Sequence, residues 1–167
     1  MLTSLIQFAD YFAGVRRRTL VVASALPENA VDWAPRSGEF TAGDILRHLA
    51  AAQLMYLGAF FGKGWHYPGH RRHLAPDKAA AVHLLEKRQR EFDVALRSTS
   101  TEALSSQRAD LAGRPLSAWR ILMMLVEHEI HHRSQLDTYL SELGILPPHL
   151  FGAGVEELPS GEPPARP

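Results

Sequence analysis

Apolar side chains recur at helical spacing in four long segments, which we predict to be helices over residues 3–26, 41–61, 77–98 and 117–143. In the first segment the recurring residues are Leu5, Phe8, Phe12, Val15 and Leu20 or Val22. In the third segment they are Val82, Leu85, Phe92 and Leu96. No segment shows a convincing strand pattern. Four amphipathic segments of about twenty residues each favour an all-α fold, a four-helix bundle.

Residues at the ends of these segments support the predicted boundaries. Pro27 ends the first helix. The Thr41 hydroxyl can cap the second helix, and Asp44 completes an S/T-x-x-D/E start signal. Gly144 is a candidate left-handed cap for the last helix, and two prolines follow it closely.

The connections between the helices differ in character. The segment between the second and third helices, residues 62–76, has fifteen residues with the sequence GKGWHYPGHRRHLAP. A connection of that length suggests a lid or a wall of a substrate site. Residues 99–115 are polar and predict an irregular connection, with a small hairpin as the alternative. We expect one domain over residues 1–150 and a loosely held tail rich in Gly, Pro and Glu over residues 151–167.

Composition and charge exclude several classes of protein. The chain has 167 residues, 46% hydrophobic and 22% charged, which is ordinary for a globular domain. Eighteen basic residues balance eighteen acidic ones, which argues against nucleic-acid binding because that function leaves a basic footprint. The absence of cysteine excludes disulfides, thiolate-ligated zinc, iron–sulfur clusters and a cysteine nucleophile.

The sequence shows no sign of a membrane or secretory segment. The first helix carries Asp10 in its apolar part and places the basic triplet at residues 16–18 after it, the reverse of a secretory signal. The longest nearly uncharged apolar stretch, residues 49–61, has thirteen residues, whereas a span takes about 20. We therefore expect a cytoplasmic protein without membrane contact. The basic triplet is interpreted as a solvated helix face.

The most informative residues are histidines of the last predicted helix. His128 and His132 are four positions apart, so they lie about 40° apart around the helix axis and about 6 Å along it. Both imidazoles leave the same face and can reach one metal ion. The flanking residues indicate that this face points inward; they are Leu125, Gln135, Leu136 and Tyr139.

His48 on the second predicted helix is a candidate third ligand. It lies among small and apolar neighbours on the inward face, and bundles build metal sites from facing helices. Three neutral histidines leave a coordination position open, as in catalytic sites. His83 is the competing third ligand, although it lies about 100° off the apolar stripe of its helix. Asp44 is open to two roles: orienting His48 or acting only at the helix start.

Two other histidine patterns have less support. Residues 128–132 match H-E-x-x-H, the zinc-protease motif, but no sheet is predicted to align a substrate. The loop histidines His66, His70 and His73 lie among Lys63, Arg71 and Arg72, which repel a cation. A solvated basic loop is favoured there, although its charges could attract an anionic substrate. Trp65 and Tyr67 could pack over a ligand or over the end of the bundle.

Two segments carry a resemblance to a known family. Residues 41–49, TAGDILRHL, with Trp33 and Pro35 ahead of them, resemble the second-helix region of the DinB-like superfamily. Residues 128–136, HEIHHRSQL, followed by Tyr139 and Leu140 and by Gly144 and Ile145, resemble its last-helix signature. The similarity spans residues 3–148, and the order and separation of the two motifs make it fairly specific.

The resemblance implies a four-helix bundle with a three-histidine metal site whose ligands are His48, His128 and His132. It also implies a divalent ion, with zinc and nickel among those found in the family, and often a homodimer. Some relatives are transferases or isomerases that use a low-molecular-weight thiol such as bacillithiol, mycothiol or glutathione.

The same chemistry suits these residues, because a divalent metal lowers the pKa of a bound thiol or water. Our leading hypothesis is an enzyme that transfers an activated thiol or water to a small electrophilic substrate. Gln135 and Tyr56 are candidate pocket residues, whereas Glu129 is turned away from the ligand face. The alternatives are a non-enzymatic metal-binding or stress-response bundle and a purely structural bundle with core histidines.

Overall fold

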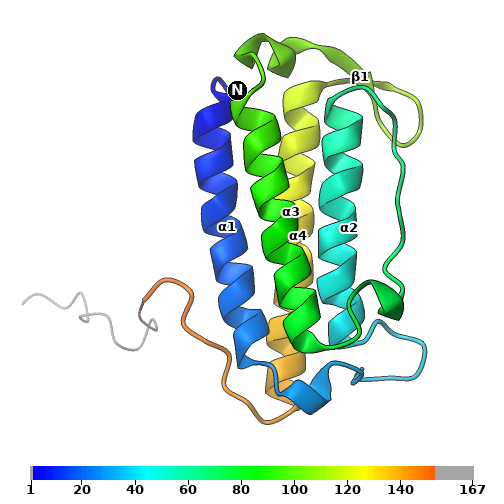
Figure 1. The fold of residues 1–167 in the computed structure, drawn as a ribbon, viewed down its shortest axis with the longest axis vertical. Helices are drawn as coiled ribbons and strands as arrows, with labels where there is room; N and C mark the ends of the chain where they lie inside the picture. Colours follow the sequence, from blue (N-terminus) through cyan, green and yellow to red (C-terminus); the bar gives the residue numbers. More distant parts are fainter. Residues whose placement is uncertain (1, 153–167) are drawn as a thin grey trace, which may run out of the picture.

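A computed structural model describes residues 2–152 and contains four long helices (Figure 1). They are α1 (Leu5–Ala25), α2 (Ala42–Phe60), α3 (Lys78–Arg97) and α4 (Ala118–Glu142). The four-helix prediction is confirmed, and each predicted boundary lies within two residues of the observed one. Three short 3-10 helices join them: η1 (Glu28–Ala30), η2 (Arg72–Leu74) and η3 (Thr101–Ser105). None of the helices of residues 2–152 has the length and apolar character needed to cross a membrane.

The connection between α3 and α4 ends in a small hairpin. Strands β1 (Gln107–Ala109) and β2 (Pro115–Ser117) pair antiparallel, with Arg108 opposite Leu116. The expectation of an irregular connection is therefore wrong here, and the hairpin alternative is right. The turn forms because an Asp110 carboxylate oxygen accepts the backbone N–H groups of Ala112 and Arg114, while Gly113 adopts φ +79°.

Local capping fixes the helix boundaries. At the start of α2, the Thr41 hydroxyl accepts the Asp44 N–H at 3.0 Å and the Asp44 carboxylate accepts the Thr41 N–H at 3.0 Å. At the end of α4, Gly144 adopts φ +74°, its N–H donates to Ser141 O, and the Ile145 N–H donates to Leu140 O at 2.9 Å. This pair of bonds is a Schellman motif, which favours glycine at the left-handed position.

The long connection after α2 follows from the direction of the helices. Helices α2 and α3 run parallel, and the connecting segment returns along the whole length of the bundle before α3 begins (Figure 1). A 19-residue helix is about 28 Å long, so an extended return takes at least about nine residues. The length of residues 62–76 is therefore explained by this return path, and we call the segment the crossover loop. The same segment also forms a wall beside α2, as described below.

In the bundle, α1 and α2 each pack against both α3 and α4. The core between the helices is apolar along most of its length. Phe8, Phe12 and Phe92 meet at one end, with ring centroids of Phe12 and Phe92 5.1 Å apart. A second cluster, around Leu46, Leu49 and Leu136, fills the other end.

A polar group interrupts the core between these clusters. Arg16 is 1% exposed and Glu129 is 0% exposed, and Arg16 Nη2 lies 3.1 Å from Glu129 Oε2. The same nitrogen donates to Gln53 Oε1 at 3.0 Å. The interpretation of residues 16–18 as a solvated face is thus wrong for Arg16. It follows Phe12 by one helical turn, so it faces the core, whereas Arg17 is exposed.

The start of α2 lies unusually close to the segment before it. A Cβ on Gly43 would lie 2.7 Å from Val31 Cγ2 and 2.8 Å from the Val31 carbonyl oxygen. We expect Gly43→Ala to lower the free energy of unfolding by about 1–3 kcal/mol, because backbone must shift to relieve the contact. Gly58→Ala on the same helix is the control, since its Cβ would meet nothing closer than 3.6 Å. Urea titrations in which Gly43→Ala is as stable as Gly58→Ala would contradict this packing.

Candidate metal centre

Three imidazoles converge between α2 and α4. His48, His128 and His132 each offer one ring nitrogen, and these three atoms lie within 4.8 Å of one another. His48 Nε2 is 2.9 Å from His128 Nε2. The rings of His48 and His132 have centroids 4.6 Å apart, and those of His128 and His132 are 4.4 Å apart. The structure therefore brings together the three histidines selected from the sequence.

The environment keeps these imidazoles neutral. Burial, together with the neighbouring His132 and His70, lowers the pKa of His48 to about 4. Burial, followed by the neighbouring His132 and His48, lowers the pKa of His128 to about 3. Burial also lowers the pKa of His132. At neutral pH each ring therefore retains a nitrogen lone pair, the form in which imidazole binds metals.

The outer ring nitrogens differ in their partners. His132 Nδ1 donates to Gln135 Oε1 at 2.6 Å, which leaves its Nε2 as the acceptor nitrogen. His48 Nδ1 lies 2.7 Å from the Tyr67 hydroxyl. His128 Nδ1 is buried and has no hydrogen-bond partner among residues 2–152. The candidate pocket residue Gln135 thus acts on a histidine of the cluster.

Aromatic side chains border the cluster. The other candidate pocket residue, Tyr56, is 7% exposed, with its ring 5.5 Å from that of His128. Trp65 lies 5.5 Å from Tyr56 and donates its indole N–H to Ala109 O, so it packs towards the hairpin end. Phe40 lies 5.5 Å from the ring of His48 on the opposite side.

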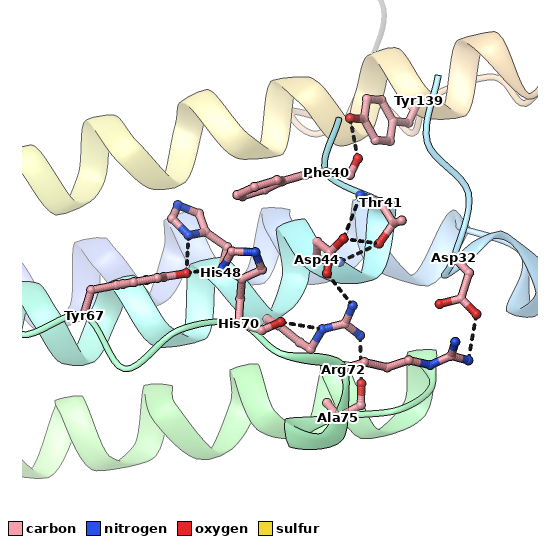
Figure 2. Close-up of polar contacts among 11 residues, drawn as sticks. Asp32, Phe40, Thr41, Asp44, His48, Tyr67, His70, Arg72, Ala75 and Tyr139 are labelled. Carbon is pink, nitrogen blue, oxygen red and sulfur yellow. Dashed lines mark hydrogen bonds and ion pairs between the residues drawn. The ribbon is translucent and has the colours of Figure 1, made fainter. Parts of the chain in front are cut away.

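Two residues of the crossover loop contact the cluster, Tyr67, for which packing over a ligand was one of two expectations, and His70, which was expected in a solvated loop. The Tyr67 hydroxyl bridges His48 and His70, at 2.7 Å from the Nδ1 atom of each (Figure 2). The interpretation of the loop as solvated holds for His66 and His73, which are exposed, but His70 is half-buried against Phe40. A loop has no helical or strand periodicity, so the sequence carried no signal for this contact.

The other residues considered for the site lie outside the histidine cluster. His83 is exposed on α3 and is not among the three converging imidazoles. Of its two possible roles, Asp44 has the one at the helix start, where it also binds Arg47 Nη2 at 2.8 Å. Arg72 pairs with Asp32 at 2.8 Å on the outside of the loop. Its charge is therefore partly compensated rather than directed at the histidines.

The position of Glu129 argues against zinc-protease chemistry. The general base of an H-E-x-x-H site must reach a water on the metal. The Glu129 carboxylate is fully buried against Arg16, in the core of the bundle. It is therefore a structural residue, and the histidine face has no glutamate from this motif.

Comparisons with known proteins agree with this architecture. The family model described as DinB family matches residues 1–160. A DinB-like protein from Bacillus cereus ATCC 10987 is 21% identical, with a TM-score of 0.75 over 89% of this chain and 99% of that one. YfiT from Bacillus subtilis, a probable metal-dependent hydrolase with an unusual four-helix bundle topology, is 14% identical, with a TM-score of 0.64 over 84% and 86%.

A third similar structure is the mycothiol-dependent maleylpyruvate isomerase. It is 19% identical, with a TM-score of 0.61 over 79% of this chain and 59% of that one. At these identities the structural likenesses establish the fold.

Proposed function

This chain belongs to the DinB family, and we propose that it is a divalent-metal-dependent enzyme acting on a small electrophilic substrate. Its nucleophile would be a low-molecular-weight thiol or water. The observation that carries the proposal is the convergence of three neutral imidazoles within 4.8 Å. The domain responsible would be the bundle of residues 1–150.

The donor set fits a divalent ion such as zinc or nickel. Zinc binds imidazole nitrogen at about 2.0–2.1 Å, so ligand nitrogens lie roughly 3–4 Å apart around it. The Nε2 atoms of His48 and His128 are 2.9 Å apart and all three donor atoms lie within 4.8 Å of one another, a range that includes that spacing. The ion would lower the pKa of a bound thiol or water and so supply a nucleophile near neutral pH.

The remaining residues of the site hold and shape it. Gln135 keeps the proton of His132 on Nδ1 and thereby leaves Nε2 free to act as a ligand. Tyr56 and Phe40 provide apolar walls on two sides of the cluster. An apolar rim around a polar centre suits a small organic substrate rather than a highly charged one.

Two observations bear on a thiol as the nucleophile. The sequence has no cysteine, so any sulfur nucleophile must be a cosubstrate. A structural relative is a mycothiol-dependent isomerase. The water alternative is favoured by the likeness to YfiT, a probable metal-dependent hydrolase. Experiment can separate thiol transfer from hydrolysis because only thiol transfer needs an added thiol.

The first test is metal binding by protein without a histidine tag. We expect close to one zinc or nickel ion per chain, and His48→Ala and His132→Ala should each weaken zinc binding tenfold or more with helical content retained. His83→Ala is the matched control because His83 is exposed on α3. Full occupancy in His48→Ala with loss in His83→Ala would show that the third ligand is His83.

The second readout of the same variants is turnover. The zinc- or nickel-loaded protein is mixed with 1-chloro-2,4-dinitrobenzene and, in parallel, with 4-nitrophenyl acetate, each with and without glutathione, bacillithiol or mycothiol. Thiol-dependent product that is lost in His132→Ala supports transfer, and thiol-independent ester cleavage supports hydrolysis. Metal binding without turnover of any pair favours the non-enzymatic bundle, and absence of metal binding contradicts the proposal.

A further inference from the structure

The Tyr67 hydroxyl lies between two imidazoles. Its oxygen is 2.7 Å from Nδ1 of His48 on α2 and 2.7 Å from Nδ1 of His70 in the crossover loop (Figure 2). A phenol has one O–H to donate and lone pairs to accept. It therefore accepts a hydrogen bond from one histidine and donates to the other. The three groups form a single hydrogen-bond chain that begins at the outer nitrogen of His48.

The crossover loop, which supplies Tyr67 and His70 to this hydrogen-bond chain, is held to α2 by a buried arginine. Arg47, which is 2% exposed, donates from Nε to the His70 carbonyl at 3.0 Å and from Nη1 to the Ala75 carbonyl at 2.9 Å. Its third contact is Asp44 Oδ1 at 2.8 Å. Because Arg47 directly precedes His48, the backbone at His70 is fixed relative to the histidine cluster.

The Phe40 ring packs against the imidazoles of both His70 and His48. Its ring centroid is 4.5 Å from that of His70 and 5.5 Å from that of His48. The Phe40 carbonyl accepts the Tyr139 hydroxyl of α4 at 2.8 Å, which holds the backbone at this ring in place. His70 is thus packed as well as hydrogen-bonded, although the loop around it is largely exposed.

A metal ion on His48 would determine which group donates and which accepts at each step of the hydrogen-bond chain. An ion on Nε2 requires the ring proton of His48 on Nδ1, which then donates to the Tyr67 oxygen. The Tyr67 O–H must in turn donate to His70 Nδ1, so His70 carries its own proton on Nε2. This order of hydrogen bonds changes only the positions of the protons and not their number.

We propose that Tyr67 and His70 are positioning residues that hold His48 in the tautomer and rotation needed to bind the metal. The inference rests on the proposed metal-dependent function. It assigns to the crossover loop a share of the metal affinity, although the loop supplies no ligand. Hydrogen-bond partners of ligating histidines commonly have this effect, and their loss typically costs about 10–100-fold in affinity.

The test compares zinc dissociation constants and histidine tautomers. Tyr67→Phe removes the hydroxyl and keeps the ring, and we expect zinc affinity to fall about tenfold or more. His70→Ala should have a similar effect, and the double variant should lose little more than the larger single loss, because both act through one chain. Long-range proton–nitrogen NMR of the zinc-loaded wild type should show His48 protonated on Nδ1 and His70 on Nε2.

The outcomes separate this inference from the proposed function. His73→Ala, an exposed histidine of the same loop, is the control and should leave zinc affinity unchanged. If wild type binds zinc and Tyr67→Phe binds it equally well, or if His70 is protonated on Nδ1, the positioning role is wrong and the metal site stands. If wild type binds no zinc, both are wrong.

Discussion

Replacement of Glu129 by alanine is expected to lower the free energy of unfolding by about 3–5 kcal/mol. The carboxylate is fully buried, with Oε2 3.1 Å from Arg16 Nη2. Removing it leaves a guanidinium that is 1% exposed and whose Nε and Nη1 already lack hydrogen-bond partners among the described residues. An uncompensated buried charge is among the most destabilising defects in a core. Urea unfolding followed by circular dichroism measures the change.

A neighbouring ion pair supplies the control. Glu127 pairs with Arg120 at 2.6 Å on the exposed side of α4, and Glu127→Ala should cost less than about 1 kcal/mol. A third variant combines Arg16→Met with Glu129→Leu and should recover most of the lost stability, since apolar replacement of both partners is often neutral. Equal losses in Glu127→Ala and Glu129→Ala would refute the role assigned to the buried pair.

The second large effect is an acid-induced loss of stability of the metal-free protein. The pKa values of His48 and His128 are lowered to about 4 and about 3 in the folded chain, against about 6.5 when unfolded. As the pH falls below about 6.5, the unfolded chain binds protons first, so the free energy of unfolding decreases. The loss continues until about pH 4 for His48 and about pH 3 for His128.

The size of this effect follows from the same pKa values. A tenfold difference in proton affinity corresponds to about 1.4 kcal/mol. Solvent around both rings and the interaction between them reduce the effect below the full difference, to roughly 2–4 kcal/mol between pH 7 and pH 4. His128→Gln should flatten this part of the stability profile, whereas His83→Gln on the exposed face of α3 should not. An unchanged slope in His128→Gln would contradict the assignment.

Local signals in the sequence were sufficient to predict the helices. The boundaries agree because Thr41, Asp77 and Gly144 cap the helices through contacts with residues only a few positions away. The i, i+4 relation of His128 and His132 is equally local, so their shared face followed from helix geometry alone.

Contacts between distant segments could not be predicted in this way. The burial of Arg16 depends on Glu129 and Gln53, which lie on two other helices. The bond between Tyr67 and His48 depends on how the crossover loop returns along α2. Helical spacing places Arg16 on the core side of α1, but it does not reveal the partners that allow a charged group to be buried there. The sequence around Tyr67 does not distinguish it from an ordinary loop tyrosine. The DinB-like resemblance supplied the pairing of His48 with α4, which periodicity alone could not.

The separation of the three histidines along the chain determines when the site can exist during protein synthesis. His48 and His128 meet across 80 positions, so the pocket is absent until most of the chain has left the ribosome. At about 5–20 residues per second, roughly 4–16 s pass between synthesis of the first histidine and the second. An ion bound there would therefore not template the early helices, and a chain interrupted before α4 would lack the three-histidine cluster altogether.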